Sequence, residues 1–432
     1  MFLYVLTMSM LLMVMGSQLG GINQINVIGY LDDLNSLSRH TSSVIDCLYG
    51  ERGLRIKLFK THTGSCADLS GSCSKVFDQA TGINSQSKIN DYIYNNTLLR
   101  GVVLYTDPQC GDLGRFKVLL SEHTLRIASL VFETTQILPE KIANVNAHSD
   151  MIIVPDPWLV NVYKNSGIIC PIFVLPLALD LAPLLARPIK KQRNTTFTFG
   201  FSGLFLKSGR KNHELLMSVF AETFGDNQQV LLKLHGRAGG AFEEIATRFN
   251  ERQTTNITFA CKGLDRQAYE DFLASLDCYV TASKGEGFSI VPREVLALGI
   301  PCIVANNTAQ ATICATGFVR PIVSNIVEQA LTHTGNWFNT DPLAIREALC
   351  DVYQNYGHYL NLAKKGREWV KQYLPKNLTK KYKMLVEPSQ VLLGDRNEIT
   401  DDYLMTDSPV LFAKYKKLYS SSKKIQFHII GG

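Results

Sequence analysis

The chain has 432 residues, of which 46% are hydrophobic and 19% charged, and its net charge is +6. This composition excludes a disordered chain and is sufficient for two or three domains of ordinary size. No basic motif interleaved with aromatic residues occurs, so we expect no nucleic-acid partner.

Residues 1–24 are predicted to be an apolar N-terminal extension. Residues 2–15 are apolar and uncharged, and no Lys or Arg precedes them as in an ordinary signal peptide. At about 14 residues, this segment is also shorter than an ordinary membrane-spanning helix. The sequence leaves open whether it is an upstream extension, an apolar stretch lying on the protein, a membrane anchor or a secretion signal.

Strands and helices alternate through the first half of the chain. The expected strands are residues 25–30, 54–59, 101–105, 126–132, 149–154 and 172–175. Residues 61–90 are polar and contain Gly and Ser, so we expect a loop-rich insertion there. The alternation is typical of a parallel sheet covered by helices on both faces.

Residues 181–196 contain two prolines and a basic run, and are predicted to be a linker. A second unit starts with a strand at 197–201, a helix at 213–224 and a strand at 229–234. The expected domains are an N-terminal α/β domain over 25–180, a C-terminal α/β domain over 197–385 and a C-terminal tail over 386–432. The polar composition of this tail gives little information.

The ten cysteines are scattered without a Cys-x-x-Cys pair, which indicates a reducing compartment. His62, Cys66 and Cys73 are close in sequence, but their spacing matches no zinc signature, so we predict no metal site. A glycan at the Asn306 sequon would obstruct the ligand site described below. We therefore expect a cytoplasmic protein. The basic residues of 364–383 indicate a solvated helix face or, alternatively, peripheral contact with an anionic membrane.

The most informative segment is residues 284–294, which read Lys-Gly-Glu-Gly-Phe-Ser-Ile-Val-Pro-Arg-Glu. A strand at 278–282 should precede it, and Ser289 should cap a helix that ends near Gly299. The flanking elements are a strand at 256–260, a helix capped by Asp265 and a strand at 300–305. Ligands of parallel sheets bind beyond the carboxyl ends of the strands, where this segment would lie.

Glu286 and Glu294 are separated by seven residues and by the expected start of a helix. Carboxylates accept hydrogen bonds from sugar hydroxyls, and a helix N-terminus offers N–H groups to phosphate oxygens. A nucleotide sugar would use both carboxylates and the helix N-terminus. Either glutamate alone is better explained as a solvated surface charge, because charged side chains usually stay exposed. The occurrence of both glutamates beside a glycine-rich loop favours a functional site over two solvated surface charges.

These residues resemble those of retaining glycosyltransferases of the GT4 family, over about residues 25–385. Glu286 to Glu294 is similar to the family's E-x7-E element, and residues 25–31 are similar to a first strand that reads INVIGYL in one branch. Weaker similarities occur in the expected order at 132–139, 149–155, 171–180 and 210–212. The resemblance implies a GT-B fold, which consists of two Rossmann-like domains with the active site in the cleft between them.

The resemblance also implies a UDP- or GDP-sugar donor held mainly by the second domain, no obligatory metal and no cofactor. Glu294 would bind the ribose, Glu286 would contact the transferred sugar, and Arg210 and Lys211 would neutralise the diphosphate. Backbone N–H groups of the helix start would hold sugar and phosphate oxygens. The implied donor-binding residues are Gly203, Arg210, Lys211, Gly287, Phe288, Ser289, Ile290 and Glu294.

Glu133 occupies the position where many relatives have histidine. The resemblance implies that it contacts the donor sugar or orients the acceptor, and the alternative is an ordinary loop carboxylate. Two departures stand out. Residues 35–39 read Asn-Ser-Leu-Ser-Arg where this branch usually carries glycines, and Leu204 replaces the usual arginine after Gly203.

The expected function is retaining, metal-independent transfer of a hexose to a hydroxyl of a glycan, a lipid-linked saccharide or a protein, as in glycan biosynthesis. One alternative is a degenerate GT-B protein that binds a nucleotide sugar without turnover, which the missing glycines favour. A second alternative is a nucleotide-sugar epimerase on the same fold.

Overall fold

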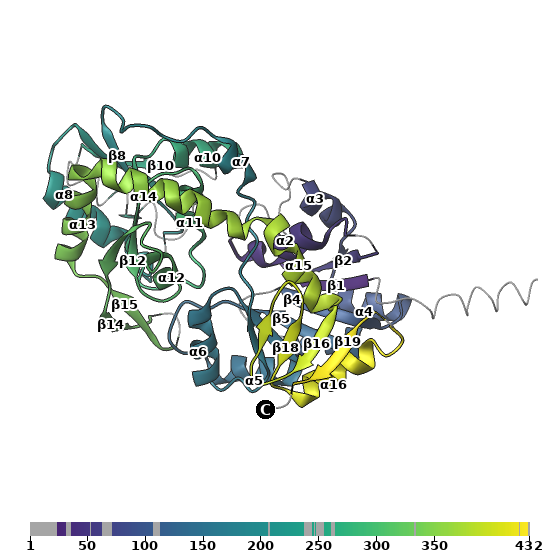
Figure 1. The fold of residues 1–432 in the computed structure, drawn as a ribbon. Helices are drawn as coiled ribbons and strands as arrows, with labels where there is room; N and C mark the ends of the chain where they lie inside the picture. Colours follow the sequence, from purple (N-terminus) through teal and green to yellow (C-terminus); the bar gives the residue numbers. More distant parts are fainter. Residues whose placement is uncertain are drawn as a thin grey trace, which may run out of the picture.

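The computed structural model shows two α/β domains joined by a short linker (Figure 1). It describes residues 24–31, 36–51, 53–62, 71–106, 113–205, 208–236, 244–245, 247, 255–260, 264–331, 334–422 and 424–430. The apolar segment 2–15, the loop residue Asn35, and Cys66 and Cys261 lie outside these residues.

The first domain is built on a seven-stranded parallel sheet in the order β3-β2-β1-β4-β5-β6-β7. Its strands are β1 (Gln24–Gly29), β2 (Arg55–Lys60), β3 (Thr81–Gly82), β4 (Leu99–Thr106), β5 (Leu120–Ser129), β6 (Met151–Val154) and β7 (Ile172–Val174). Neighbouring residues of a strand point to opposite faces, so Val27 and Ile28 enter two different cores. Burial of both faces explains why these strands read as continuous apolar runs.

Helices cover both faces of this sheet. One core contains side chains of α2 (Arg39–Leu48) and α3 (Gly71–Asp78), and the other contains side chains of α4 (Gln86–Asn95), α5 (Pro139–His148) and α6 (Pro157–Asn165). Two short 3-10 helices, η1 (Ser36–Ser38) and η2 (Leu113–Leu119), precede α2 and β5 respectively.

The prediction of a loop-rich insertion at 61–90 is wrong for its described residues, which contain α3, β3 and the first part of α4. Val76 of α3 and Ile89 of α4 are buried in the two cores. Ser85 caps α4 by accepting a hydrogen bond from the Lys88 amide at 3.3 Å. These helices carry few apolar residues, and the sheet beneath them supplies most of their stabilisation, which a composition-based reading does not detect.

The second domain has a six-stranded parallel sheet in the order β10-β9-β8-β11-β12-β13. Its strands are β8 (Phe197–Ser202), β9 (Val230–His235), β10 (Ile257–Ala260), β11 (Cys278–Thr281), β12 (Cys302–Asn306) and β13 (Arg320–Val323). The strand order reverses between β8 and β11, and ligands of open α/β sheets bind at such a switch point. The segment 284–294 follows β11 and lies at this position.

The helices of the second domain are α7 (Ala182–Ala186), α8 (His213–Phe224), α10 (Arg266–Ala274), α11 (Ile290–Ala297), α12 (Gln310–Cys314), α13 (Pro342–Gln354) and α14 (Tyr356–Trp369). As expected, Asp265 caps α10 by accepting from the Ala268 amide at 2.8 Å. Gly299 follows the end of α11 with a φ of 71°, in the left-handed conformation that ends many helices.

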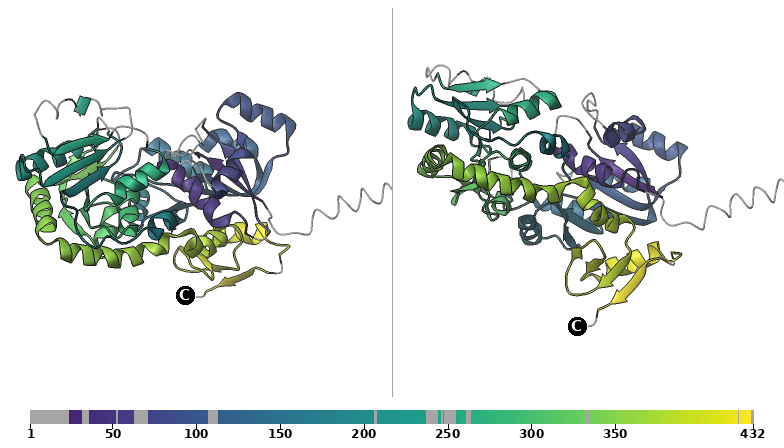
Figure 2. Two further views of the ribbon diagram at one scale, coloured as in Figure 1. Left: turned by 90° about the horizontal axis from the view of Figure 1, so that it is seen from above. Right: turned by 45° about the horizontal axis from the view of Figure 1, so that its top comes forward.

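Residues 370–386 carry the chain back to the first domain through η3 (Val370–Tyr373) and α15 (Pro375–Val386). Leu378, Tyr382 and Leu385 of α15 are buried in the core beside α2. Figures 1 and 2 show the yellow C-terminal segment that follows α15 against the first domain. The chain therefore crosses between the domains twice.

Residues 390–429, which composition alone left as a tail, form a small sheet in the order β17-β18-β16-β19. Its elements are β16 (Gln390–Leu393), β17 (Glu398–Ile399), β18 (Leu404–Thr406), α16 (Pro409–Leu418) and β19 (Gln426–Ile429). Val391, Leu411 and Tyr415 are buried in the same core as α2 and α15. This sheet is thus packed on the first domain. Within the described residues, no helix is long and apolar enough to cross a membrane.

Candidate active site

The carboxylate of Glu286 lies in a cluster of charged side chains after β11. Lys211 donates a hydrogen bond to Glu286 Oε1, and Arg210 Nη1 lies 3.5 Å from Glu286 Oε2. Arg210 also donates to the Gly285 carbonyl at 2.7 Å, and its own carbonyl accepts from the Lys284 amide at 2.8 Å. The two basic residues and the glycine-rich loop are therefore fixed to each other.

Burial controls the protonation of this cluster. Desolvation alone would raise the pKa of Glu286, but Lys211 and Arg210 outweigh it and hold this pKa below its ordinary value. Desolvation lowers the pKa of Lys211, and the neighbouring Glu286 opposes this effect. The Glu286 carboxylate is thus an ionised acceptor, which suits it to binding hydroxyls.

Glu133 joins the cluster from the first domain, after β5. Its Oε1 lies 3.5 Å from Arg210 Nη2, on the opposite arm of the guanidinium from Glu286. Two carboxylates therefore flank one guanidinium, and Lys211 supplies a second positive charge. The charges of these four side chains balance.

The two glycines of the loop make this arrangement sterically possible. A Cβ atom on Gly285 would lie 2.1 Å from the Glu133 carbonyl oxygen, and one on Gly287 would lie 2.0 Å from Val131 Cγ2. The loop of the second domain is thus in direct contact with the backbone of the first. The Gly-x-Gly pattern serves this contact between domains, a role that the sequence alone did not reveal.

Helix α11 starts after Ser289, as predicted, but Ser289 does not cap it. Ser289 has a φ of 58°, in the left-handed region, and its hydroxyl makes no capping hydrogen bond. At this turn Arg293, which is fully buried, donates through Nη1 to the carbonyls of Phe288 and Ser289. The Arg293 guanidinium also lies 4.0 Å from the centre of the Phe288 ring.

Arg293 is a residue that the sequence analysis missed. An arginine within an otherwise apolar helix start was the available signal, since a cation at such a position needs specific partners. Its contacts stabilise the backbone of residues 288–289, where the N–H groups implied to bind the donor lie. We therefore regard Arg293 as a residue that positions this loop.

Glu294 is buried on α11 and touches both domains. Tyr269 donates to Glu294 Oε2 at 2.7 Å, and Arg39 Nη2 of the first domain lies 3.5 Å from Oε1. Burial and the adjacent Glu294 raise the pKa of Tyr269, which keeps its hydroxyl a donor. A carboxylate has about four acceptor positions, so sites remain for two ribose hydroxyls. Neither Tyr269 nor Arg39 was predicted as a site residue.

The remaining predicted residues lie around these two glutamates. Gly203 follows β8, and a Cβ atom there would lie 3.8 Å from Lys211 Cδ. Phe288 is buried and Ile290 is half-buried at the start of α11. Leu204, which replaces a usual arginine, is 42% exposed. The charged cluster thus gathers Glu133, Arg210, Lys211 and Glu286, whereas Glu294 binds a separate pair of residues.

His40 lies on α2, close to the carboxyl end of β5. Its Nδ1 is 2.6 Å from the Ser129 hydroxyl, and burial lowers its pKa to about 3. Below pH 6.5 the unfolded chain binds a proton at His40 that the folded chain does not bind until about pH 3. The folded state is therefore expected to lose roughly 1.4 kcal/mol per pH unit below pH 6.5 from this group.

A second buried group acts in the opposite direction. Burial raises the pKa of Asp46 to about 6, so the folded state gains stability as the pH falls through 6 towards 3.8.

The contribution of His40 is isolated by comparing the wild type with His40→Gln, whose side chain at position 40 does not titrate. The free energy of unfolding is measured by urea unfolding at pH 7 and at pH 5. Its decrease between these two pH values should be about 2 kcal/mol smaller in the variant than in the wild type. Identical pH profiles would contradict a buried neutral His40.

Within the described residues, no group of three or more His, Cys, Asp or Glu side chains could hold a metal ion. His62 pairs with the Thr61 hydroxyl at 2.8 Å and packs against the Tyr30 ring. Cys73 donates to Asp46 at 3.5 Å, and burial raises the pKa of its thiol.

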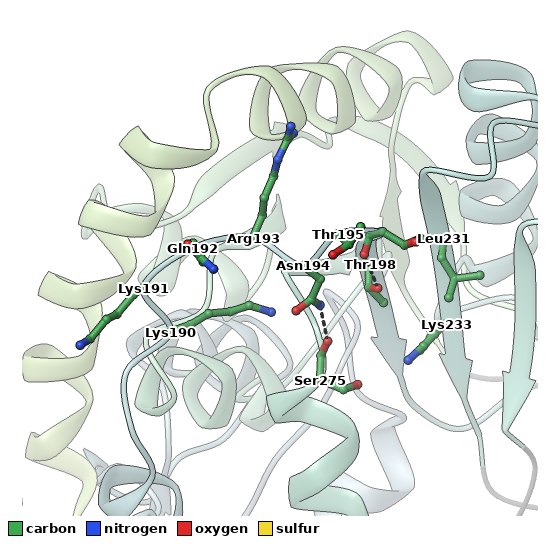
Figure 3. A pocket seen from close by; sticks show the side chains of 11 residues that line it. Lys190, Lys191, Gln192, Arg193, Asn194, Thr195, Thr198, Leu231, Lys233 and Ser275 are labelled. Atoms are coloured by element: carbon green, nitrogen blue, oxygen red, sulfur yellow. Dashed lines mark hydrogen bonds between the residues drawn. The ribbon is translucent and has the colours of Figure 1, made fainter.

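A surface hollow of about 880 Å³ lies away from the glutamates, between the linker and the second sheet (Figure 3). It is lined by Lys190, Lys191, Gln192, Arg193, Asn194, Thr195, Thr196, Thr198, Leu231, Lys233 and Ser275. Lys190 is paired with Asp277 at 2.8 Å. None of the predicted site residues lines this hollow, so we do not place the chemistry there.

Comparison with known proteins bears on the family and the fold of the chain. Residues 186–369 match the family model described as Glycosyl transferases group 1. No curated protein matches the chain significantly. The match covers the second domain and includes all the predicted site residues except Glu133.

Solved structures similar to the chain include three glycosyltransferase structures of low sequence identity. Sucrose-phosphate synthase from Thermosynechococcus elongatus has a TM-score of 0.61 and 15% identity, over 84% of this chain and 98% of that one. HepE from Anabaena, in complex with UDP and glucose, has a TM-score of 0.58 and 11% identity, over 83% and 97%. The lipopolysaccharide outer core galactosyltransferase WaaB has a TM-score of 0.57 and 13% identity, over 84% and 98%.

The fold of the chain is GT-B, as expected from the sequence. The family match and this fold together support a GT-B glycosyltransferase.

Proposed function

We propose that the protein is a retaining, metal-independent glycosyltransferase of the GT4 family. It transfers a hexose from a UDP- or GDP-sugar to a hydroxyl of a glycan, a lipid-linked saccharide or a protein. The observation that carries this proposal is the cluster of Arg210, Lys211 and Glu286 at the switch point of the second sheet, where Glu133 approaches from the first domain.

The assigned roles are those that the resemblance implies, and the chemistry of the side chains suits them. Glu294 accepts hydrogen bonds from the ribose, and Glu286 accepts them from the transferred sugar. Arg210 and Lys211 stabilise the diphosphate, and two fixed cations supply the neutralisation that a divalent metal supplies in other transferases. Glu133 orients the acceptor or contacts the donor sugar. The bond between the anomeric carbon and the phosphate oxygen breaks, and the acceptor oxygen bonds to that carbon on the same face. The acceptor proton passes to the departing phosphate.

A second candidate is a GT-B protein that binds a nucleotide sugar without turnover. The charge balance of the cluster favours it, because Glu133 and Glu286 already neutralise Arg210 and Lys211. The absence of glycine at residues 35–39 favours it as well. Transfer or hydrolysis of a bound donor would exclude this candidate.

The test is a thermal-shift panel of UDP-, GDP-, ADP- and dTDP-sugars with the wild type and Glu294→Gln. At ~100 times its dissociation constant, the true donor should stabilise the wild type by about 2.7 kcal/mol. The variant should lose most of this shift, because the neutral amide replaces two charge-assisted hydrogen bonds to the ribose, each about 1.5–3 kcal/mol.

Glu368→Gln is the matched control, since Glu368 lies on α14 with a side chain that is 68% exposed. An acceptor screen with and without EDTA then tests transfer and its independence of metal. The absence of a shift with every donor would contradict the proposed function, and a shift that survives in Glu294→Gln would contradict the role of Glu294.

A further inference from the structure

A β-hairpin of the second domain is bonded to the first domain beside the charged cluster. The hairpin consists of β14 (Ile326–Gln329) and β15 (Asn336–Asn339), and Figure 1 shows it on the side that faces α6. Thr134 donates to the Thr334 carbonyl at 2.6 Å. The Thr135 hydroxyl accepts from the Asn336 amide at 2.9 Å, and the Thr135 amide donates to the Asn336 carbonyl at 3.2 Å. Residues 334–336 and 134–135 are therefore joined by three hydrogen bonds.

Steric contact reinforces these bonds. A Cβ atom on Gly335 would lie 2.6 Å from the Gln136 backbone nitrogen, so the two segments touch without space for a side chain. The backbone of Gly335 has a φ of 85°, which turns the chain towards this contact. The hairpin thus presents its backbone, rather than its side chains, to the first domain at this point.

The same hairpin is also fixed to the loop that carries Glu286. The Phe338 amide donates to the Lys284 carbonyl at 2.9 Å, and Lys284 pairs with Glu328 at 2.7 Å. Trp337 is fully buried, and its Cδ1 lies 3.2 Å from the position of a Cβ atom on Gly285. The hairpin and the Glu286 loop therefore act as one rigid support.

Residues 131–136 of the first domain are consequently held from two sides. The glycines at 285 and 287 touch residues 131–133, and the hairpin bonds to residues 134–135 and touches Gln136. Glu133 lies between these two sets of contacts. We propose that the hairpin is a positioning element for the transfer reaction, in which Thr134, Thr135 and Gly335 set Glu133 against Arg210 and hold the two domains together. This inference rests on the proposed function and adds to it three residues outside the donor site.

The double variant Thr134→Val/Thr135→Val removes two of the three hydrogen bonds and preserves the size of both side chains. Loss of two hydrogen bonds should lower the ratio of joined to separated domains roughly tenfold or more. We expect kcat for transfer to fall about threefold to tenfold, since the joined state is the competent one and the fraction of joined molecules falls by less than the ratio of joined to separated domains. Affinity for UDP should change less than threefold, because the second domain holds most of the nucleotide. A merely structural role would lower the melting temperature without lowering kcat more than the affinity for UDP.

Thr223→Val is the matched control, because the Thr223 hydroxyl bonds only to the Val219 carbonyl within α8, at 2.6 Å. A second pair of variants tests the hairpin side of the contact. Gly335→Ala and Gly317→Ala both place alanine at a positive φ, of 85° and 71°, but only Gly335 has a neighbouring atom within 4 Å. A larger loss of kcat in Gly335→Ala than in Gly317→Ala is expected.

Small-angle X-ray scattering measures the separation of the domains independently of activity. We expect a larger radius of gyration in the double variant than in the wild type and Thr223→Val. If the wild type binds no nucleotide sugar, the proposed function fails, while the scattering comparison still decides whether the hairpin holds the domains. Unchanged scattering together with unchanged kcat in the double variant would overturn the inference.

Discussion

Replacing Gly285 with alanine should lower kcat/KM for transfer at least ~100-fold, since a misplacement of about 1 Å at a reacting site can have an effect of that size. The added Cβ would lie 2.1 Å from the Glu133 carbonyl oxygen, a distance that real Cβ atoms do not show. The obstacle is backbone, so no side-chain rotation relieves it, and the loop and residue 133 must move apart. Gly285 is not at a positive φ, so the effect is steric and not conformational.

The displacement should separate Glu133 from Arg210 and leave the donor contacts of Glu294 intact. Steady-state transfer kinetics and UDP affinity, measured on the same preparation, check this expectation. Gly357→Ala is the control, because Gly357 lies in α14 with open space around its Cβ position, where alanine favours the helix by up to about 1 kcal/mol. A Gly285→Ala enzyme with wild-type kcat/KM would show that contact between residues 285 and 133 is not needed for turnover.

The strands and the position of Glu286 could be predicted because their signals are local. β8, β11 and β12 are buried on both faces and read as short apolar runs bounded by polar residues, so their existence follows from the sequence. Asp265 and Gly299 mark helix ends through their own chemistry. A carboxylate after a strand and before a helix is then placed at the ligand edge of the sheet by topology alone.

The features that were missed depend on contacts between distant segments. Arg39 and Tyr269 meet Glu294 across 255 and 25 positions of sequence, and no local pattern indicates either pairing. Residues 390–429 bury their apolar side chains in a core that they share with α2 and α15, but these side chains are interspersed with polar residues, so the average composition resembles that of a tail. The capping role expected of Ser289 was wrong because its backbone has a left-handed φ of 58° instead of the extended conformation of an N-cap, and its hydroxyl makes no capping hydrogen bond.

The charged cluster explains why a donor can enter a site whose charges already balance. Glu286 is paired with Lys211 and Arg210. A diphosphate carries more negative charge than one carboxylate and accepts more hydrogen bonds, so it competes for the same cations. In the proposed function, Glu286 is then released from Lys211 and becomes available to the hydroxyls of the sugar. On this proposal, the same ion pairs orient Arg210 and Lys211 before the donor binds and are exchanged when it arrives.

Removal of Arg210 tests this account with a large expected effect. Arg210→Ala should lower kcat about 10²–10³-fold, because the leaving diphosphate loses a fixed cation at the position where charge develops. The same change leaves Glu133 without its partner from the second domain and leaves Lys211 as the remaining cation beside Glu286. The pKa of Glu286 should therefore rise, and the acidic limb of the pH–rate profile should move to higher pH.

Two further variants separate charge from geometry. Arg210→Lys retains the charge but cannot bond to both flanking carboxylates, so its kcat should lie between those of the wild type and Arg210→Ala. Lys233→Ala removes a cation of the same domain that lines the hollow of Figure 3 and lies outside the cluster, and it should leave kcat within about twofold, as surface substitutions usually do. If Arg210→Ala kept kcat within threefold of the wild type, the diphosphate would have to bind elsewhere, and the cluster would be an ion-pair contact that joins the two domains.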